Sequence, residues 1–117
     1  MPQGSRTERV GEGFREILAE EVLRLKDPRV GFVTITGVKV SPDLHQAWVY
    51  FTAYGDDKER AGTRAALRSA TTHLRRELGR QVRLKVTPEI EFVEDDTLQS
   101  GERIDRIIEE LHRQERS

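Results

Sequence analysis

Residues 60–87 carry a concentration of positive charge that is the most distinctive chemical feature of the chain. Against one acidic residue, Glu77, this stretch sets eight basic side chains: Arg60, Arg64, Arg68, Arg75, Arg76, Arg80, Arg83 and Lys85. The planar guanidinium group of arginine donates paired hydrogen bonds to phosphate oxygens. Because so dense a run repels itself unless an anion compensates it, we expect either the chain's own acidic segment or a nucleic-acid backbone to supply that anion.

The spacing of these cations suggests how they are displayed. Arg60, Arg64 and Arg68 recur every four residues and would form one stripe on a helix. If about six of the cations neutralise phosphates, log K should fall against log salt with a slope of about −5. Arg29, which follows Asp27-Pro28, is a secondary candidate contact.

The rest of the chain is acidic, so the net charge of −1 conceals a polarised molecule. Residues 1–59 have a net charge of −2, and residues 88–117 have a net charge of −6. The acidic C-terminal segment is suited either to compensate the arginines or to dock a basic protein.

Residues typical of catalysis or metal binding are few and scattered. There is no cysteine, which excludes disulfides and thiolate ligands and suits a reducing compartment. His45, His73 and His112 fall on different predicted elements, and Asp95-Asp96 is explained as a helix N-cap. No glycine-rich phosphate loop or nucleophile motif is present. We therefore expect a non-enzymatic protein with no cofactor, no bound metal and no small-molecule substrate.

The chain also lacks the features of a membrane protein. Its first five residues have no apolar h-region, and no apolar stretch approaches the ~20 residues that span a bilayer. We expect a soluble, cytoplasmic protein with no membrane partner.

The elements that must display the cations begin with a helix and a hairpin. Apolar residues at three- and four-residue spacing predict a helix over residues 7–25. An alternating stretch over residues 33–40 reverses its parity at Gly37, which is typical of a β-bulge. Residues 45–54 alternate throughout, and the short turn before them predicts an antiparallel hairpin.

A second helical region carries most of the cations. Asp56 with Glu59 three residues later resembles a capping box, and Gly79 resembles a C-cap after a last helical residue, Leu78. Polar residues that compete with helix formation interrupt its middle, so we predict two helices that meet at a kink formed by Ser69, Ala70, Thr71 and Thr72.

A third strand and a closing helix complete the pattern. Alternation over residues 82–93 predicts a strand with Arg83 and Lys85 on one face. Pro88 cannot donate a ladder hydrogen bond, so this strand should be broken there or lie at an edge. Residues 97–113 carry apolar residues in helical phase and predict a C-terminal helix.

With 117 residues there is room for one domain. We expect a flexible N-terminus over residues 1–5, a single RNA-binding domain over 6–113 and a frayed tail over 114–117. The order α-β-β-α-(kink)-α-β is that of a type II KH-like domain. This α+β fold would have a three-stranded mixed sheet with helices on one face, plus the C-terminal helix.

The local sequence resembles the ribosome-binding factor A family over about residues 6–111. Lys26–Gly31 resembles the KDPR-x-G element that follows the family's first helix. Thr36–Leu44, followed by Ala47–Tyr50, resembles the family's hairpin motif T-x-V-x-V-S-x-D-L…A-x-V-Y. Further residues of the chain resemble the family's third strand and closing helix: Leu78-Gly79, Leu84, Pro88, Glu89–Phe92, Asp95-Asp96 and Gly101-x-Arg103-Ile104. The order and spacing of these motifs together carry the resemblance.

The resemblance implies a monomeric assembly factor of the bacterial small ribosomal subunit. Such a protein binds the immature 30S particle through 16S rRNA, assists late folding and processing of that RNA, and leaves before translation; the family is linked to growth in the cold. An alternative is a protein–protein adaptor whose acidic C-terminal segment docks a basic ribosomal protein, and a small hydrolase is a weaker third possibility.

The chain departs from the KH pattern at the kink. KH domains use a Gly-x-x-Gly loop between paired helices to bring their backbone close to nucleotides, and this chain has none. The family has an Ala-x-Gly kink instead, and the matching positions here are Ala70-Thr71-Thr72. Because a β-branched threonine disfavours positive φ, we expect a shallower kink or one at another position.

Overall fold

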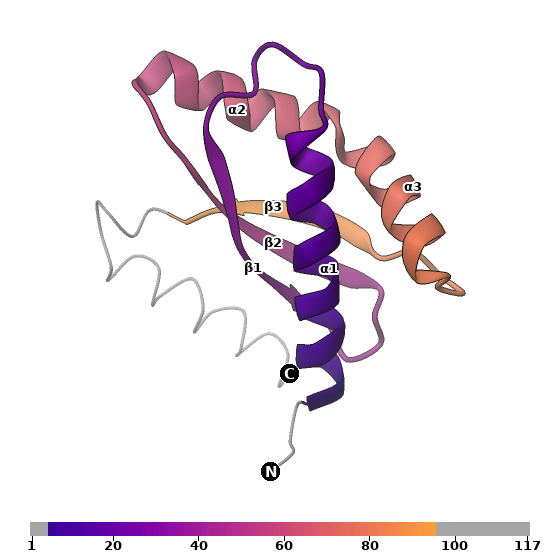
Figure 1. Cartoon of the computed structure of the whole chain (residues 1–117). Helices are drawn as coiled ribbons and strands as arrows, with labels where there is room; N and C mark the ends of the chain where they lie inside the picture. Colours follow the sequence, from indigo (N-terminus) through magenta and orange to yellow (C-terminus); the bar gives the residue numbers. More distant parts are fainter. Residues whose placement is uncertain (1–4, 96–117) are drawn as a thin grey trace.

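A computed structural model of the chain describes residues 5–95, which form three helices and three strands (Figure 1). In chain order these are α1 (Ser5–Leu23), β1 (Val33–Val40), β2 (Gln46–Ala53), α2 (Asp57–Ser69), α3 (Thr71–Val82) and β3 (Glu89–Glu94). The predicted order of elements is confirmed. The predicted C-terminal helix (97–113) and tail (114–117) lie outside the described residues, as do residues 1–4.

The sheet is mixed, as the fold class predicts. Its strand order is β1-β2-β3, with β2 antiparallel to β1 and parallel to β3. The register shifts between Ile35 and Gly37, which confirms the predicted bulge. In the turn of the hairpin the Asp43 carboxylate accepts hydrogen bonds from the backbone N–H of His45 and the hydroxyl of Ser41, and both lower the pKa of Asp43.

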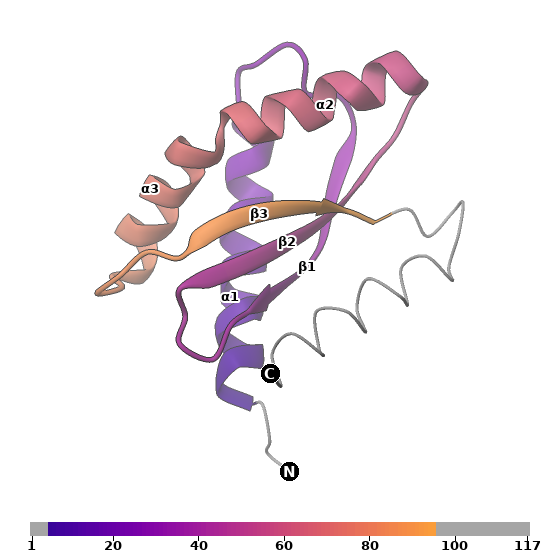
Figure 2. The same ribbon diagram turned by 180° about the vertical axis from the view of Figure 1, so that it is seen from behind.

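One hydrophobic core lies between the sheet and the helices. Every second residue of β2, from Ala47 to Ala53, is buried on the face that the helices cover. Side chains from all three helices complete the core: Phe14, Leu18 and Val22 from α1, Leu67 from α2, and Leu74 and Leu78 from α3. Figure 2 shows α1 behind the strands, with α2 and α3 on the side of β3.

Two helices meet at Ala70, within the predicted kink. Ala70 adopts right-handed dihedral angles (φ −87°, ψ −1°), and its N–H donates to the carbonyl of Ala66 over 3.0 Å. Thr72 already lies in α3, and its φ is not positive. The kink therefore has the position that the family pattern implies, and it needs no glycine.

The boundary between α3 and β3 corrects the sequence prediction. α3 continues past Leu78 to Val82, and Arg83 caps it in the left-handed conformation (φ 57°, ψ 51°). Gly79 lies inside the helix, where Thr87 packs against it: a Cβ at Gly79 would lie 2.7 Å from the Thr87 Oγ1. The prediction that Gly79 is a C-cap is wrong, because this glycine serves a close contact within α3.

The third strand consequently begins at Glu89, not at residue 82. Arg83 and Lys85 lie in the loop between α3 and β3, so the prediction that they share one face of a strand is wrong. Pro88 directly precedes β3, and β3 is an edge strand, which confirms both expectations about that proline.

Within residues 5–95 no helix is long and apolar enough to cross a membrane.

Candidate nucleic-acid interface

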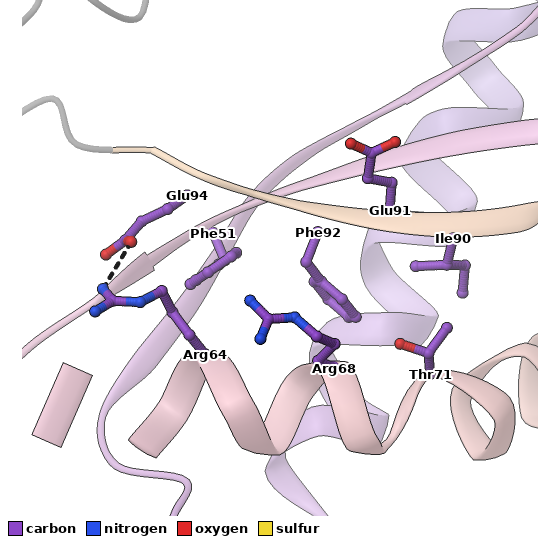
Figure 3. A pocket seen from close by; sticks show the side chains of 8 residues that line it. All are labelled: Phe51, Arg64, Arg68, Thr71, Ile90, Glu91, Phe92 and Glu94. Carbon is purple, nitrogen blue, oxygen red and sulfur yellow. Dashed lines mark hydrogen bonds and ion pairs between the residues drawn. The ribbon is translucent and has the colours of Figure 1, made fainter. Parts of the chain in front are cut away.

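α2 and the edge strand β3 flank a cavity of about 380 Å³ (Figure 3). Its apolar lining comes from Phe51, Ile90 and Phe92, and the two phenylalanine rings meet edge to face with centroids 6.0 Å apart. Its polar lining comes from Arg64, Arg68 and Thr71 on the helices and from Glu91 and Glu94 on β3. The cavity thus joins an apolar base to a rim that carries both signs of charge.

The predicted stripe of Arg60, Arg64 and Arg68 is confirmed: the three residues lie on one side of α2, which faces β3. Glu94 binds two members of the stripe: its carboxylate lies 2.9 Å from the Arg64 Nη1 and 3.4 Å from the Arg60 Nη2. The Arg60 and Glu94 side chains are only 18% and 22% exposed, so water screens this pair less than a surface pair. A phosphate that approaches Arg60 or Arg64 must therefore compete with Glu94.

Arg68 differs from its two neighbours on the stripe. Its side chain is exposed and, among residues 5–95, no ion pair or hydrogen bond engages its guanidinium group. Figure 3 shows the group directed into the space between α2 and β3. Arg68 is the cation of this cavity that is available to an external anion.

Arg29 lies against the kink in a charged pair with Asp27. Its Nη2 lies 2.7 Å from the Asp27 carboxylate and 3.3 Å from the Ser69 Oγ, at the end of α2. Hydrogen bonds from the side chain and backbone of Arg29 lower the pKa of Asp27 to about 2, and the same pair raises the pKa of Arg29. Arg29 therefore links the loop after α1 to the kink.

Arg75 points inward toward the chain rather than outward to solvent. Its Nε donates to the Pro88 carbonyl over 2.9 Å, and its Nη2 donates to the Thr87 carbonyl over 3.0 Å. A longer ion pair of 3.5 Å joins it to Glu89. These contacts occupy the guanidinium fork, so Arg75 is poorly placed to bind phosphate.

The remaining cations follow α3 and its C-terminal loop. Arg76 and Arg80 lie one turn apart on the side of α3 away from the buried Leu74 and Leu78. Arg80 pairs with Glu77 over 2.9 Å, an exposed i, i+3 contact of small energy. In the described part of the chain, no ion pair or side-chain hydrogen bond engages Arg76, Arg83 or Lys85.

The nine residues predicted to contact RNA thus form two groups. Within the range 5–95, five of them are bound by other residues of the protein and four are not; the five are Arg29, Arg60, Arg64, Arg75 and Arg80. The four, which we call the free cations, are Arg68, Arg76, Arg83 and Lys85. In the same range no group of three or more His, Asp or Glu side chains is arranged to hold a metal ion.

Residues 6–108 match the sequence profile of the family described as ribosome-binding factor A. The chain belongs to the ribosome-binding factor A family. The ribosome-binding factor A of Geobacter sulfurreducens is 46% identical over 108 residues, which are 92% of either chain.

Solved structures of ribosome-binding factor A share the fold. The crystal structure from Thermus thermophilus superposes with a TM-score of 0.68 at 31% identity, and covers 75% of this chain and 94% of that one. A homology model of the Thermus thermophilus ribosome-binding factor A, fitted into a cryo-EM map of its complex with 30S, gives a TM-score of 0.61 at 32% identity, and covers 71% of this chain and 88% of that one.

Sequence reasoning missed the roles of two residues that shape this surface. Glu94 was counted only as part of an acidic segment, although it neutralises Arg60 and Arg64. Arg75 was counted as an RNA contact, although it holds backbone carbonyls. The available signal for Glu94 was its parity, because it lies on the face of β3 that carries Ile90 and Phe92; nothing in the sequence marked the partners of Arg75.

Proposed function

We propose that this protein is a cytoplasmic assembly factor that binds the immature small ribosomal subunit as a monomer, through the phosphates of 16S rRNA. The observation that carries the proposal is the set of four free cations on a chain of this family. Support comes from the related Thermus thermophilus protein, whose coordinates were fitted into a map of its complex with the 30S subunit.

The free cations provide the contacts that such binding needs. Each guanidinium or ammonium group that meets a phosphate releases counterions from the RNA, which favours association at low salt. Arg68 adds a cation beside the apolar surface of Phe51 and Phe92, at a cavity whose lining is suited to hold a base or ribose next to a phosphate.

We infer that binding assists late maturation and processing of 16S rRNA without catalysis. A protein that binds one fold of an RNA more tightly than another shifts the population toward that fold by its difference in affinity. The processing of the RNA ends would then follow from the shape that the RNA adopts.

The test is sedimentation of lysate through a sucrose gradient, with the wild-type chain and the charge-reversal variant Arg68→Glu/Arg76→Glu. We expect the wild type to migrate with free small subunits and not with complete ribosomes, and the variant to remain at the top. The matched control is Arg6→Glu/Lys58→Glu, which makes the same change of charge at exposed positions near the starts of α1 and α2, where glutamate suits a helix N-terminus.

Binding to protein-free 16S rRNA distinguishes the remaining alternative. Loss of this binding in the charge-reversal variant, with the control unaffected, supports the proposal. Equal binding by the variant and the wild type would contradict it and favour the adaptor, in which a protein–protein contact holds the factor on the subunit.

A further inference from the structure

The loop between α3 and β3, residues 83–88, is fixed at both ends. At its start, Arg83 turns the chain out of α3 in the left-handed conformation. At its end, the buried Pro88 leads into β3, and Arg75 binds the carbonyls of Pro88 and Thr87 over 2.9 and 3.0 Å. Thr87 also packs against Gly79 of α3. The loop therefore has a defined path across the end of the molecule.

The same loop exposes its two cations and packs the residue between them, Leu84, against the core. Arg83 and Lys85 are exposed, and within residues 5–95 no ion pair or hydrogen bond engages either side chain. Val86 beyond them is 54% exposed. Because Leu84 packs inward, Arg83 and Lys85 on either side of it lie on the outer face of the loop.

Arg75 also changes the electrostatics beneath these cations. Carbonyl oxygens carry partial negative charge, and those of Thr87 and Pro88 lie at the base of the loop. The Arg75 guanidinium covers both, and its 3.5 Å pair with Glu89 offsets a nearby carboxylate. An approaching phosphate consequently meets less negative potential around Arg83 and Lys85.

We propose that this loop is an RNA-contacting element, in which Arg83 and Lys85 bind phosphodiester groups and Arg75 is a positioning residue that holds the loop in shape. The inference rests on the proposed function, because the ligand is the RNA backbone that the family member would meet. A loop that is ordered before binding loses less conformational entropy when it binds, so its two contacts contribute more to affinity.

The test is a double-mutant cycle that measures affinity for protein-free 16S rRNA at several salt concentrations. The loop variant is Arg83→Gly/Lys85→Ala, in which glycine suits the positive φ of residue 83. We expect it to lose about tenfold or more in affinity near 0.1 M salt, and its salt slope to fall by about 1.5 to 2. Arg75→Met should lose nearly as much alone and little more when combined with the loop variant, because both act on the same contacts.

Arg75→Lys separates positioning from direct contact. If Arg75 bound phosphate itself, lysine would keep the charge and most of the salt slope. If Arg75 holds two carbonyls at once, lysine cannot reproduce the fork, and the slope should fall despite the unchanged charge. If the backbone amide chemical shifts differ from those of the wild type only in residues 83–89, the variant is folded and only the loop has moved.

The outcomes distinguish this inference from the proposed function. Unchanged affinity in the loop variant, with binding abolished by Arg68→Glu/Arg76→Glu, would overturn the role of the loop and leave the proposed function intact. Additive losses from the loop variant and Arg75→Met would overturn the positioning role. Short RNA probes of one sequence, single-stranded and double-stranded, then show which form of backbone the loop contacts. If the loop variant loses affinity for either probe, the inference is supported; if it loses affinity for neither, the inference is contradicted.

Discussion

At the scale of single residues, the charged pair of Asp27 and Arg29 shows how one contact sets the properties of a loop. The Arg29 backbone N–H and its Nε both donate to the Asp27 carboxylate, and its Nη2 bonds to both Asp27 and Ser69. This geometry fixes the turn after α1 and attaches it to the end of α2. The family-like Lys26–Gly31 element thus has a structural use beside the kink, and Arg29 is less free to bind RNA than the sequence suggested.

The protonation of Asp27 tests this pair. The pKa of Asp27 is lowered to about 2 in the folded protein, mainly by the side-chain hydrogen bonds of Arg29. Because the folded value lies below that of the unfolded chain, the pair contributes stability above about pH 4 that is lost as the pH falls toward 2. A ¹³C NMR titration of the Asp27 carboxyl should give a midpoint near 2, and Arg29→Met should move it toward about 4. A wild-type midpoint near the ordinary value would contradict the pairing.

At the scale of elements, the sequence predicted the order and the kink but not where α3 gives way to β3. Periodicity reports the elements well because burial of one face enforces it. The contact between Gly79 and Thr87 joins α3 to the loop that follows it, and the short alternation after residue 82 mimics a strand. Local pattern cannot distinguish a glycine that admits a neighbouring side chain from one that ends a helix.

Substitution of Gly79 tests that explanation, because its effect on the free energy of unfolding should change sign when Thr87 is also replaced. Alanine is preferred to glycine inside a helix by about 1 kcal/mol, yet its Cβ would lie 2.7 Å from the Thr87 Oγ1, in a loop that Arg75 restrains. We expect Gly79→Ala to lower the free energy of unfolding by about 1 to 2 kcal/mol. In a Thr87→Ala background the same change should raise it by up to about 1 kcal/mol. Urea denaturation of the four proteins measures both effects, and the same sign in both backgrounds would exclude the close contact as the cause.

At the scale of the whole molecule, charge is distributed between two ends. The start of α2 carries Asp56, Asp57 and Glu59 against Lys58, and the end of α3 with its loop carries Arg80, Arg83 and Lys85. The two ends lie on opposite sides of the molecule (Figures 1 and 2). Such a separation orients the cationic end toward a polyanion during approach.

Composition was therefore a sound guide to which segment carries the cations, and a poor guide to how many of them are available for phosphate. Glu94 lies 30 residues from Arg64 and 34 from Arg60 along the chain, so only the folded sheet brings them together. Sequence reasoning counted side chains by type, whereas the number available for phosphate depends on which of them the fold has already paired.

The salt dependence of RNA binding measures that number. Four free cations predict a slope of log K against log salt between about −3 and −4, shallower than the about −5 that the sequence suggested. Glu94→Gln should release Arg64, strengthen binding and steepen the slope by about 1, whereas Arg60 keeps its 3.7 Å ion pair with Asp57. The control is Glu91→Gln, on the same strand: it removes the same charge, and among the described residues no ion pair engages Glu91. Equal changes in both variants would mean that Glu94 acts only through net charge and does not hold Arg64 back from the RNA.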